Sequence, residues 1–328
     1  QTDVSSTYYN SGYMNNYYNY LYGYGSSSYY NSYENYYDPD KYIQLFGASV
    51  GWGKRLRWPD DYFVLSMSLA FTRYILKNWN YFLIATGNSN NLNFNISLSR
   101  TSTDNQLFPR RGSEFDLSLS ITPPWSAFDG KNYEYLAKDY QSVNYQKELQ
   151  DKYRWIEYHK WKFKSKTYTA LTSGSKCFVL MTRVELGILG SYNKHNKSPF
   201  ETFYMGGDGM SGYSSYAEET IGLRGYDNGS LTSNGQTGYA YARFSLELRY
   251  PFMLGNTTIY GLTFAEAGNA WSEVHKFNPF DIKRSAGVGV RLFLPMVGLM
   301  GIDWAYGFDK VFGSKGGSNF HFILGQEF

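Results

Sequence analysis

Apolar and polar side chains alternate along most of this chain, in long segments that begin near Tyr42. Alternation with a period of two is the pattern of a β-strand that has one apolar face and one polar face. The segment 283–294 shows the pattern clearly. One face carries Ala286, Val288, Val290, Leu292 and Leu294, and the other carries Lys283, Ser285, Gly287, Gly289 and Arg291.

Eleven such segments, each of roughly 10–16 residues, predict an all-β protein. Barrels made by single bacterial chains have an even number of strands, so the odd count predicts that the chain lacks the first part of a barrel. The segments are 42–58, 62–79, 91–104, 113–122, 158–171, 177–192, 239–252, 257–271, 283–294, 299–308 and 319–328.

The ends of these segments distinguish a barrel from a sandwich, which would show the same alternation. Very short turns, such as 59–61, alternate with long loops, such as 123–156, and this is typical of outer-membrane barrels. Because a sheet in lipid cannot leave an edge unpaired, the pattern predicts a closed transmembrane antiparallel β-barrel. Aromatic residues cluster at the segment ends as in the girdles of such barrels, namely Trp58, Trp79, Tyr192, Trp271 and Phe328.

The composition agrees with a membrane barrel. Aromatic residues make up 20% of the chain, which argues against disorder, and only 18% of residues are charged. The net charge of +3 without a dense basic tract argues against nucleic-acid binding. No window holds 18 uncharged apolar residues, so we expect no transmembrane helix. A barrel strand needs only about 9–11 residues and has a low mean hydropathy.

Residues 1–41 consist mainly of Tyr, Asn, Ser and Gly, and we expect them to form an extracellular loop before the barrel portion at 42–328. One interpretation is a flexible surface loop, because these residue types favour turns. The other is a Tyr-rich contact surface for a partner, since adaptable binding loops use the same residues. A second polar stretch, 123–156, has helical spacing between Tyr145 and Trp155.

A further loop, 193–238, is unusually long, and its Gly-rich part 205–227 is too polar to form barrel wall. Its tip carries Arg224, and Glu247 and Glu266 lie on the inward faces of the strands that follow. A guanidinium inside a partly closed lumen needs carboxylate partners, which would favour entry of the loop. The spacing fits equally well a solvated loop arginine beside ordinary lumen acids.

No group of residues has the spacing of a catalytic or metal site. The four histidines are scattered, the sequence contains neither HExxH nor GxSxG, and the glycines at 206–209 lack a phosphate-binding lysine. The single cysteine, Cys177, rules out a disulfide framework. We therefore predict no catalytic residue, no metal and no cofactor. A hydrolase sited at the barrel rim is a minor alternative, which turnover assays on lipids and peptides would test.

Three motifs, in this order along the chain, resemble a known family. Leu223-Arg224-Gly225-Tyr226 resembles the V/L-R-G-F/Y signature at the tip of the sixth extracellular loop of the BamA-type family, a group of barrels preceded by POTRA domains. Residues 264–268 (FAEAG) resemble the family's F-x-D-x-G motif, with Glu266 where Asp is usual. Residues 320–328 resemble its C-terminal β-signal. The Tyr-rich loop resembles the versions in Bacteroidota-like bacteria.

The resemblance implies a barrel of 16 strands, of which this chain would hold strands six to sixteen, without the POTRA domains. It implies that loop 193–238 folds into the lumen. The residues involved would be Arg224, Gly225 and Tyr226 from the loop tip, with Glu247, Phe264, Glu266 and Gly268 from the wall. A lateral seam and C-terminal signal would include Phe320, Phe322, Leu324, Gly325 and Phe328.

The resemblance also implies a function. Members of the family fold and insert β-barrel proteins into the outer membrane without ATP, through a seam between the first and last strands. The chain would then be the central subunit of this machinery, a multi-pass barrel of the cell outer membrane and not an enzyme. Its partners would be periplasmic and surface-exposed lipoprotein subunits, unfolded outer-membrane protein clients, outer-membrane lipid and lipopolysaccharide, but no nucleic acid. The alternative in the same superfamily is a two-partner-secretion transporter or pore.

Overall fold

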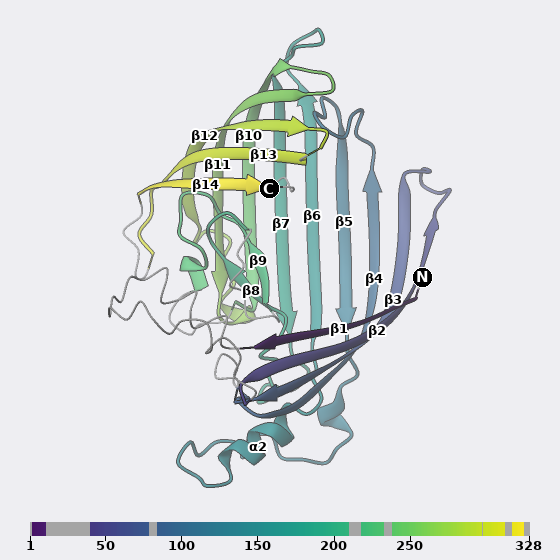
Figure 1. Ribbon diagram of the computed structural model, residues 1–328, viewed down its shortest axis with the longest axis vertical. Coiled ribbons are helices and arrows are strands. Elements are labelled where there is room, and N and C mark those ends of the chain that lie inside the picture. Colours follow the sequence, from purple (N-terminus) through teal and green to yellow (C-terminus); the bar gives the residue numbers. More distant parts are fainter. Residues whose placement is uncertain are drawn as a thin grey trace, which may run out of the picture.

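The computed structural model describes residues 2–10, 40–78, 84–209, 218–232, 238–296, 298–311 and 317–324, and Figure 1 shows its strands as one large curved sheet. The sheet has 12 strands in the order β1-β2-β3-β4-β5-β6-β7-β10-β11-β12-β13-β14. Each strand is antiparallel to its neighbours. Between β7 and β10 the chain leaves the sheet to form loop 193–238.

The strand bounds follow the alternating segments of the sequence. The first six strands are β1 (Thr2–Asn10), β2 (Tyr42–Arg55), β3 (Phe63–Lys77), β4 (Gly87–Thr101), β5 (Gly112–Ile121) and β6 (His159–Ala170). The other six are β7 (Val179–Gly190), β10 (Ala240–Met253), β11 (Thr258–Trp271), β12 (Lys283–Leu294), β13 (Gly298–Gly307) and β14 (Ser318–Leu324). The prediction of an all-β antiparallel architecture is confirmed.

One strand is additional to the eleven predicted. Residues 2–10, expected within the Tyr-rich loop, form β1, which pairs with β2 from Thr2↔Val50 to Asn10↔Tyr42. The segment contains Val4, Thr7 and two tyrosines, and β-branched and aromatic residues favour strands over loops. The expected loop from residue 11 to residue 39 lies outside the described residues. In the described part of the chain, β1 and β14 end the sheet order, and no ladder joins them.

The two faces of the sheet differ as predicted. On β7 the buried positions alternate strictly, and the inward side chains are Val179, Met181, Arg183 and Glu185. On β14 the outward side chains Phe320, Phe322 and Leu324 are each more than 60% exposed, as lipid-facing residues of a barrel wall are. Apolar side chains thus cover the outside of the wall, whereas the lumen is lined by charged side chains, such as Arg183 and Glu185, together with buried apolar ones, such as Val179 and Met181.

Short helices lie at the long-loop end, which in outer-membrane barrels is extracellular. They are η1 (Trp125–Ala127), α2 (Tyr145–Lys152) and η3 (Val274–Lys276), whereas η2 (Ser230–Thr232) belongs to loop 193–238. Helix α2 falls where the sequence shows helical spacing, and it is tied to the wall because the Gln150 side-chain amide donates to the backbone oxygen of Asn88. Among the described residues no helix is long and apolar enough to cross a membrane.

The opposite end of the lumen has an apolar floor under the C-terminal strands. The turn between β4 and β5 folds back so that Phe108 is buried against Tyr260 of β11, with ring centroids 5.2 Å apart. Tyr168, Cys177 and Met181 belong to the same apolar cluster. Asp104 stiffens the turn by accepting hydrogen bonds from the backbone N–H groups of Arg110 and Arg111. This turn therefore covers the short-turn end of the lumen.

Candidate functional site in the lumen

Loop 193–238 lies on the concave side of the sheet, where Figure 1 shows its two short strands inside the curve. These are β8 (Thr202–Met205) and β9 (Glu218–Ile221), which pair in parallel. Apolar side chains of the loop fill the space against the wall: Phe203 packs edge-on against Tyr241, and Phe200 stacks on Tyr74. The entry of the loop therefore buries apolar area, which favours it independently of any charge.

The tip of the loop lies against the backbone of β12 and β13. Gly225 has a φ of +87°, a conformation that favours glycine, and a Cβ there would lie 2.9 Å from Ser285 Cβ and 3.0 Å from Gly307 N. The next residue, Tyr226, donates its hydroxyl to the backbone oxygen of Arg284 at 2.7 Å. The tip thus fits the wall only with glycine at position 225.

Arg224, before this glycine, holds three strands through one guanidinium. Its Nη2 donates to Glu247 Oε1 of β10 at 2.5 Å and to Glu266 Oε1 of β11 at 2.8 Å, and its Nη1 donates to Asp303 Oδ2 of β13 at 3.0 Å. The Arg224 backbone N–H donates to Glu266 Oε2 at 2.9 Å. The guanidinium carbon also lies 3.5 Å from the centroid of the Phe264 ring, as in a cation–π contact.

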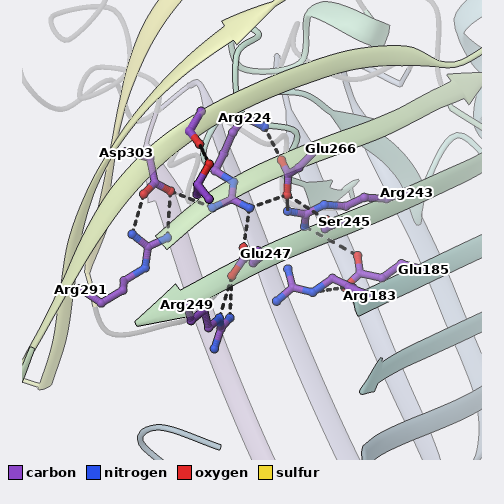
Figure 2. Close-up of polar contacts among 12 residues, drawn as sticks. Arg183, Glu185, Arg224, Arg243, Ser245, Glu247, Arg249, Glu266, Arg291 and Asp303 are labelled. Carbon is purple, nitrogen blue, oxygen red and sulfur yellow. Dashed lines mark hydrogen bonds and ion pairs between the residues drawn. The ribbon is translucent and has the colours of Figure 1, made fainter. Parts of the chain in front are cut away.

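Each of the three carboxylates has a second arginine partner, and Figure 2 shows how these side chains converge from neighbouring strands. Arg243 binds Glu266 at 2.7 Å, Arg249 binds Glu247 at 2.7 Å, and Arg291 binds Asp303 at 2.6 Å. The side chains of all these residues are at most 4% exposed. Because an unpaired buried charge is very costly, the cluster is stable only when its members are all present.

The cluster continues to Arg183 and Glu185 on β7. Glu185 lies 3.8 Å from Arg243 and 4.0 Å from Arg183, so it pairs with both at long range. The Arg183 guanidinium is buried, and in the described part of the chain none of its nitrogens has a hydrogen-bond partner. Five buried guanidiniums thus share four carboxylates, and Arg183 is the least well satisfied of them. We call this whole group, from Arg183 to Asp303, the arginine cluster.

A second set of ion pairs holds the loop to β6. Lys160 contacts Glu219 at 2.9 Å and Glu201 at 3.2 Å, and Lys162 contacts Glu219 at 3.0 Å. Burial opposes ionisation of Glu219, but the ammonium groups of the two lysines lower the pKa of its carboxyl to about 2. The carboxylates are 23% and 32% exposed, unlike those of the arginine cluster. We call this group the lysine anchor.

The structure brings together all the residues that the loop motif and the strand motif place in the lumen. Arg224 meets Glu247 and Glu266, so the solvated-arginine interpretation does not hold in this structure. Gly268 is also constrained, because a Cβ there would lie 2.6 Å from Met205 Cε in the loop. By contrast, the outward-facing Phe320, Phe322 and Leu324 do not join this group, and Gly325 and Phe328 lie outside the described residues.

Sequence reasoning missed several members of the site. Asp303, Arg243, Arg249 and Arg291 all occupy inward positions of the alternating pattern, which was the available signal. What the pattern does not give is the register between strands, and register decides which inward residues meet. His321, one of the four scattered histidines, also belongs to the site, because its Nε2 accepts a hydrogen bond from the Gly225 N–H at 2.9 Å. No sequence motif marks the residues of the lysine anchor.

The fold and the site define a class: an outer-membrane β-barrel whose lumen is occupied by one of its own loops. Residues 2–328 match the family model described as the Omp85 superfamily domain, so the chain belongs to the Omp85 superfamily. Over 122 residues it is 34% identical to the outer membrane protein assembly factor BamA of Neisseria meningitidis serogroup B (strain ATCC BAA-335 / MC58). That stretch is 36% of this chain and 14% of the Neisseria protein.

A solved structure shows the same fold. It is the crystal structure of BamA from Haemophilus ducreyi lacking POTRA domains 1–3, with a TM-score of 0.58 and 18% sequence identity. The likeness covers 86% of this chain and 54% of that one. The chain thus spans about half of this solved relative and a smaller part of the curated one. The predicted location in the cell outer membrane is confirmed by family and fold.

Proposed function

We propose that this chain is the C-terminal barrel portion of an insertase, which folds outer-membrane proteins and inserts them through a seam between its first and last strands. The observation that carries the proposal is an unequal distribution of contacts along the sheet. The arginine cluster fastens the loop to β10, β11 and β13, whereas β14 ends the sheet order and, among the described residues, has a paired neighbour on one side only. Strong contacts between the loop and the wall, next to a sheet edge with fewer contacts, suit an insertase that opens at that edge.

A weakly held edge provides the chemistry that insertion needs. An unfolded client strand in lipid must satisfy its backbone N–H and C=O groups, because lipid offers no hydrogen-bonding partners. Addition of that strand to an exposed sheet edge, or β-augmentation, supplies the missing hydrogen bonds. The insertase therefore needs no catalytic group, metal or cofactor, and its work is done by backbone pairing. Gly325 and Phe328 remain predicted parts of this seam.

The transporter alternative requires a water-filled path through the lumen. Two features of the described residues weigh against such a path. The loop fills part of the lumen with buried side chains, including Phe203, Arg224 and Tyr226. The Phe108 turn covers the other end. Transport would require both the loop and the Phe108 turn to move out of the lumen. Moving the loop would expose the paired charges of the arginine cluster.

Reconstitution of the full-length protein with its partner subunits in liposomes tests the proposal. We expect faster folding of an unfolded barrel client, measured by the heat-modifiable migration of the folded form on gels. An engineered disulfide between β14 and the first barrel strand should abolish the acceleration, and reduction should restore it. A disulfide at matched outward positions of β12 and β13 is the control. Conductance with the loop in place, without any acceleration, would identify the transporter instead.

We also propose a surface partner for the Tyr-rich segment, a surface-exposed lipoprotein of the same machinery. Its support is the density of tyrosine in residues 11–39, since Tyr, Ser, Gly and Asn suit adaptable contact surfaces. Because residues 2–10 belong to the sheet, the deletion that tests it should remove 11–39 and keep β1. Affinity purification should then lose the partner while barrel assembly continues. An unchanged set of co-purified proteins would contradict the proposal.

A further inference from the structure

The loop tip contacts the strand at the end of the sheet, and this contact has a chemical requirement of its own. His321 lies on the inward face of β14 and is buried. Its Nε2 accepts the backbone N–H of Gly225 at 2.9 Å, across 96 residues of sequence. Gly225 cannot move away easily, because its neighbours Arg224 and Tyr226 are fastened to β10–β13. The backbone N–H of Gly225, which points at β14, is therefore held in place.

The hydrogen bond sets the protonation state of the imidazole. A histidine nitrogen accepts a hydrogen bond only when it carries no proton, so Nε2 must be bare and Nδ1 must carry the proton of the neutral ring. Protonation of His321 would set two N–H groups against each other and remove the contact. This bond thus exists only with a neutral ring, whereas the arginine cluster does not depend on histidine.

Four charged groups from three parts of the structure surround the ring. Asp303 is its cross-strand partner on β13, and Glu266 faces it from β11. Arg224 and Asp208 face it from the loop. The carboxylate of Asp303 is already bound by Arg224 and Arg291, and that of Glu266 by Arg224 and Arg243. These acids are thus committed to arginines, and the ring's own bond is to the loop backbone.

We propose that His321 is a positioning residue of the seam: its neutral imidazole holds β14 to the loop tip, and β14 separates from β13 only after this bond breaks. The inference rests on the proposed function, because it assumes that β14 borders the opening. It assigns the loop a role beyond stabilising the lumen. The loop also sets how readily β14 is released. Acidification favours this release because it protonates His321.

Hydrogen exchange of the full-length protein in nanodiscs tests this inference. His321→Leu removes the acceptor, and we expect exchange in peptides covering 318–324 and 222–227 to rise roughly fivefold, the factor that corresponds to one hydrogen bond. His321→Gln keeps an acceptor at similar reach, so it should exchange like the wild type. Phe322→Leu, on the outward face of the same strand, is the matched control. Unchanged exchange in His321→Leu would overturn the proposal.

The pH response separates a positioning role from a merely structural one. After correction for intrinsic exchange rates, lowering the pH from about 7.5 to about 5.5 should raise exchange of the same peptides in the wild type and in Phe322→Leu. His321→Gln should show no such response, and a response that persists in it would contradict the assignment. Client folding is measured on the same wild-type preparation. Absence of accelerated folding would contradict the proposed function and leave the exchange result standing.

Discussion

The loop is held to the wall at two places that differ in almost every physical respect. In the arginine cluster one planar guanidinium reaches three carboxylates that are fully buried and already shared with other arginines. In the lysine anchor two flexible ammonium groups meet two carboxylates that water still reaches. Exposed ion pairs contribute about 0–1 kcal/mol, while breaking a buried pair costs about 3–5 kcal/mol.

The difference shows that the two contacts do different work. The lysine anchor is adjustable, because lysine is a point charge on a flexible stem and its partners keep part of their hydration. The arginine cluster permits only one arrangement, because a rigid fork must meet three fixed acceptors. We infer that the lysines keep the loop near the wall and that Arg224 sets its exact register. The following changes, from the largest expected effect to the smallest, test this contrast.

Replacing Arg224 with alanine should have the largest effect. The change leaves three buried carboxylates short of a partner, so we expect a loss of about 3–5 kcal/mol. Limited proteolysis should then cut loop 193–238, and the melting temperature of the folded barrel should fall. Arg284→Ala, which breaks an exposed pair with Asp309, is the control and should leave the melting temperature nearly unchanged. A loop that stays protease-resistant in Arg224→Ala would refute the contrast.

Changes at Glu266 should rank next, because one of its oxygens accepts from Arg224, Arg243 and Ser245 at once. Glu266→Gln removes the charge and should cost about 1.5–3 kcal/mol, the range for a hydrogen bond to a charged group. Glu266→Asp restores the residue usual in the family motif but shortens the reach, so its cost should be smaller. Thermal unfolding of both variants shows which change costs more stability. Equal costs would mean that the reach of the side chain matters as much as its charge at this position.

The double change Lys160→Met and Lys162→Met should have a smaller effect than either Arg224→Ala or Glu266→Gln. The arginine cluster remains, so the loop stays in the lumen. Because Lys160 is buried and its partner carboxylates are partly exposed, the loss of stability should lie between the values for exposed and buried pairs, at about 1–2 kcal/mol. Proteolysis should become faster near β8 and β9 and stay slow at the tip. A loss of stability as large as that of Arg224→Ala would show that the lysine anchor and the arginine cluster contribute equally, which would refute the contrast.

The smallest effect expected is that of mild acid on the lysine anchor. The pKa of Glu219 is lowered to about 2, so the stabilisation by this carboxylate is present above its ordinary pKa near 4.5 and is lost only as the pH falls toward 2. At pH 4 the anchor should therefore hold, and proteolysis near β9 should match that at neutral pH. Cleavage there already at pH 5 would show that Glu219 is not held by the lysines.

Much of the wall was predictable from the sequence, because period-two alternation survives wherever one face meets lipid and the other the lumen. The two contacts Arg224–Glu247 and Arg224–Glu266 were foreseeable because family motifs contain Arg224 and Glu266 and the alternation places Glu247 on an inward face. Asp303 and His321 were not, since their meeting with the loop depends on the register of β13 and β14 and on the path of the loop. Strand β1 was missed because its tyrosines suit loops and strands alike. Phe108 was missed because turns that fold back leave no periodic signal.

The position of Arg224 in the chain has a consequence for the order in which the barrel forms. All of its strand partners follow it, by 23 to 79 residues, and His321 follows its neighbour by 96. A newly made chain therefore carries a bare arginine loop until β10, β11 and β13 have been made, and no partial set of strands satisfies it. The ion pairs of Arg224 are therefore complete only when β13 is in place, so the loop and the C-terminal strands depend on each other for their final structure.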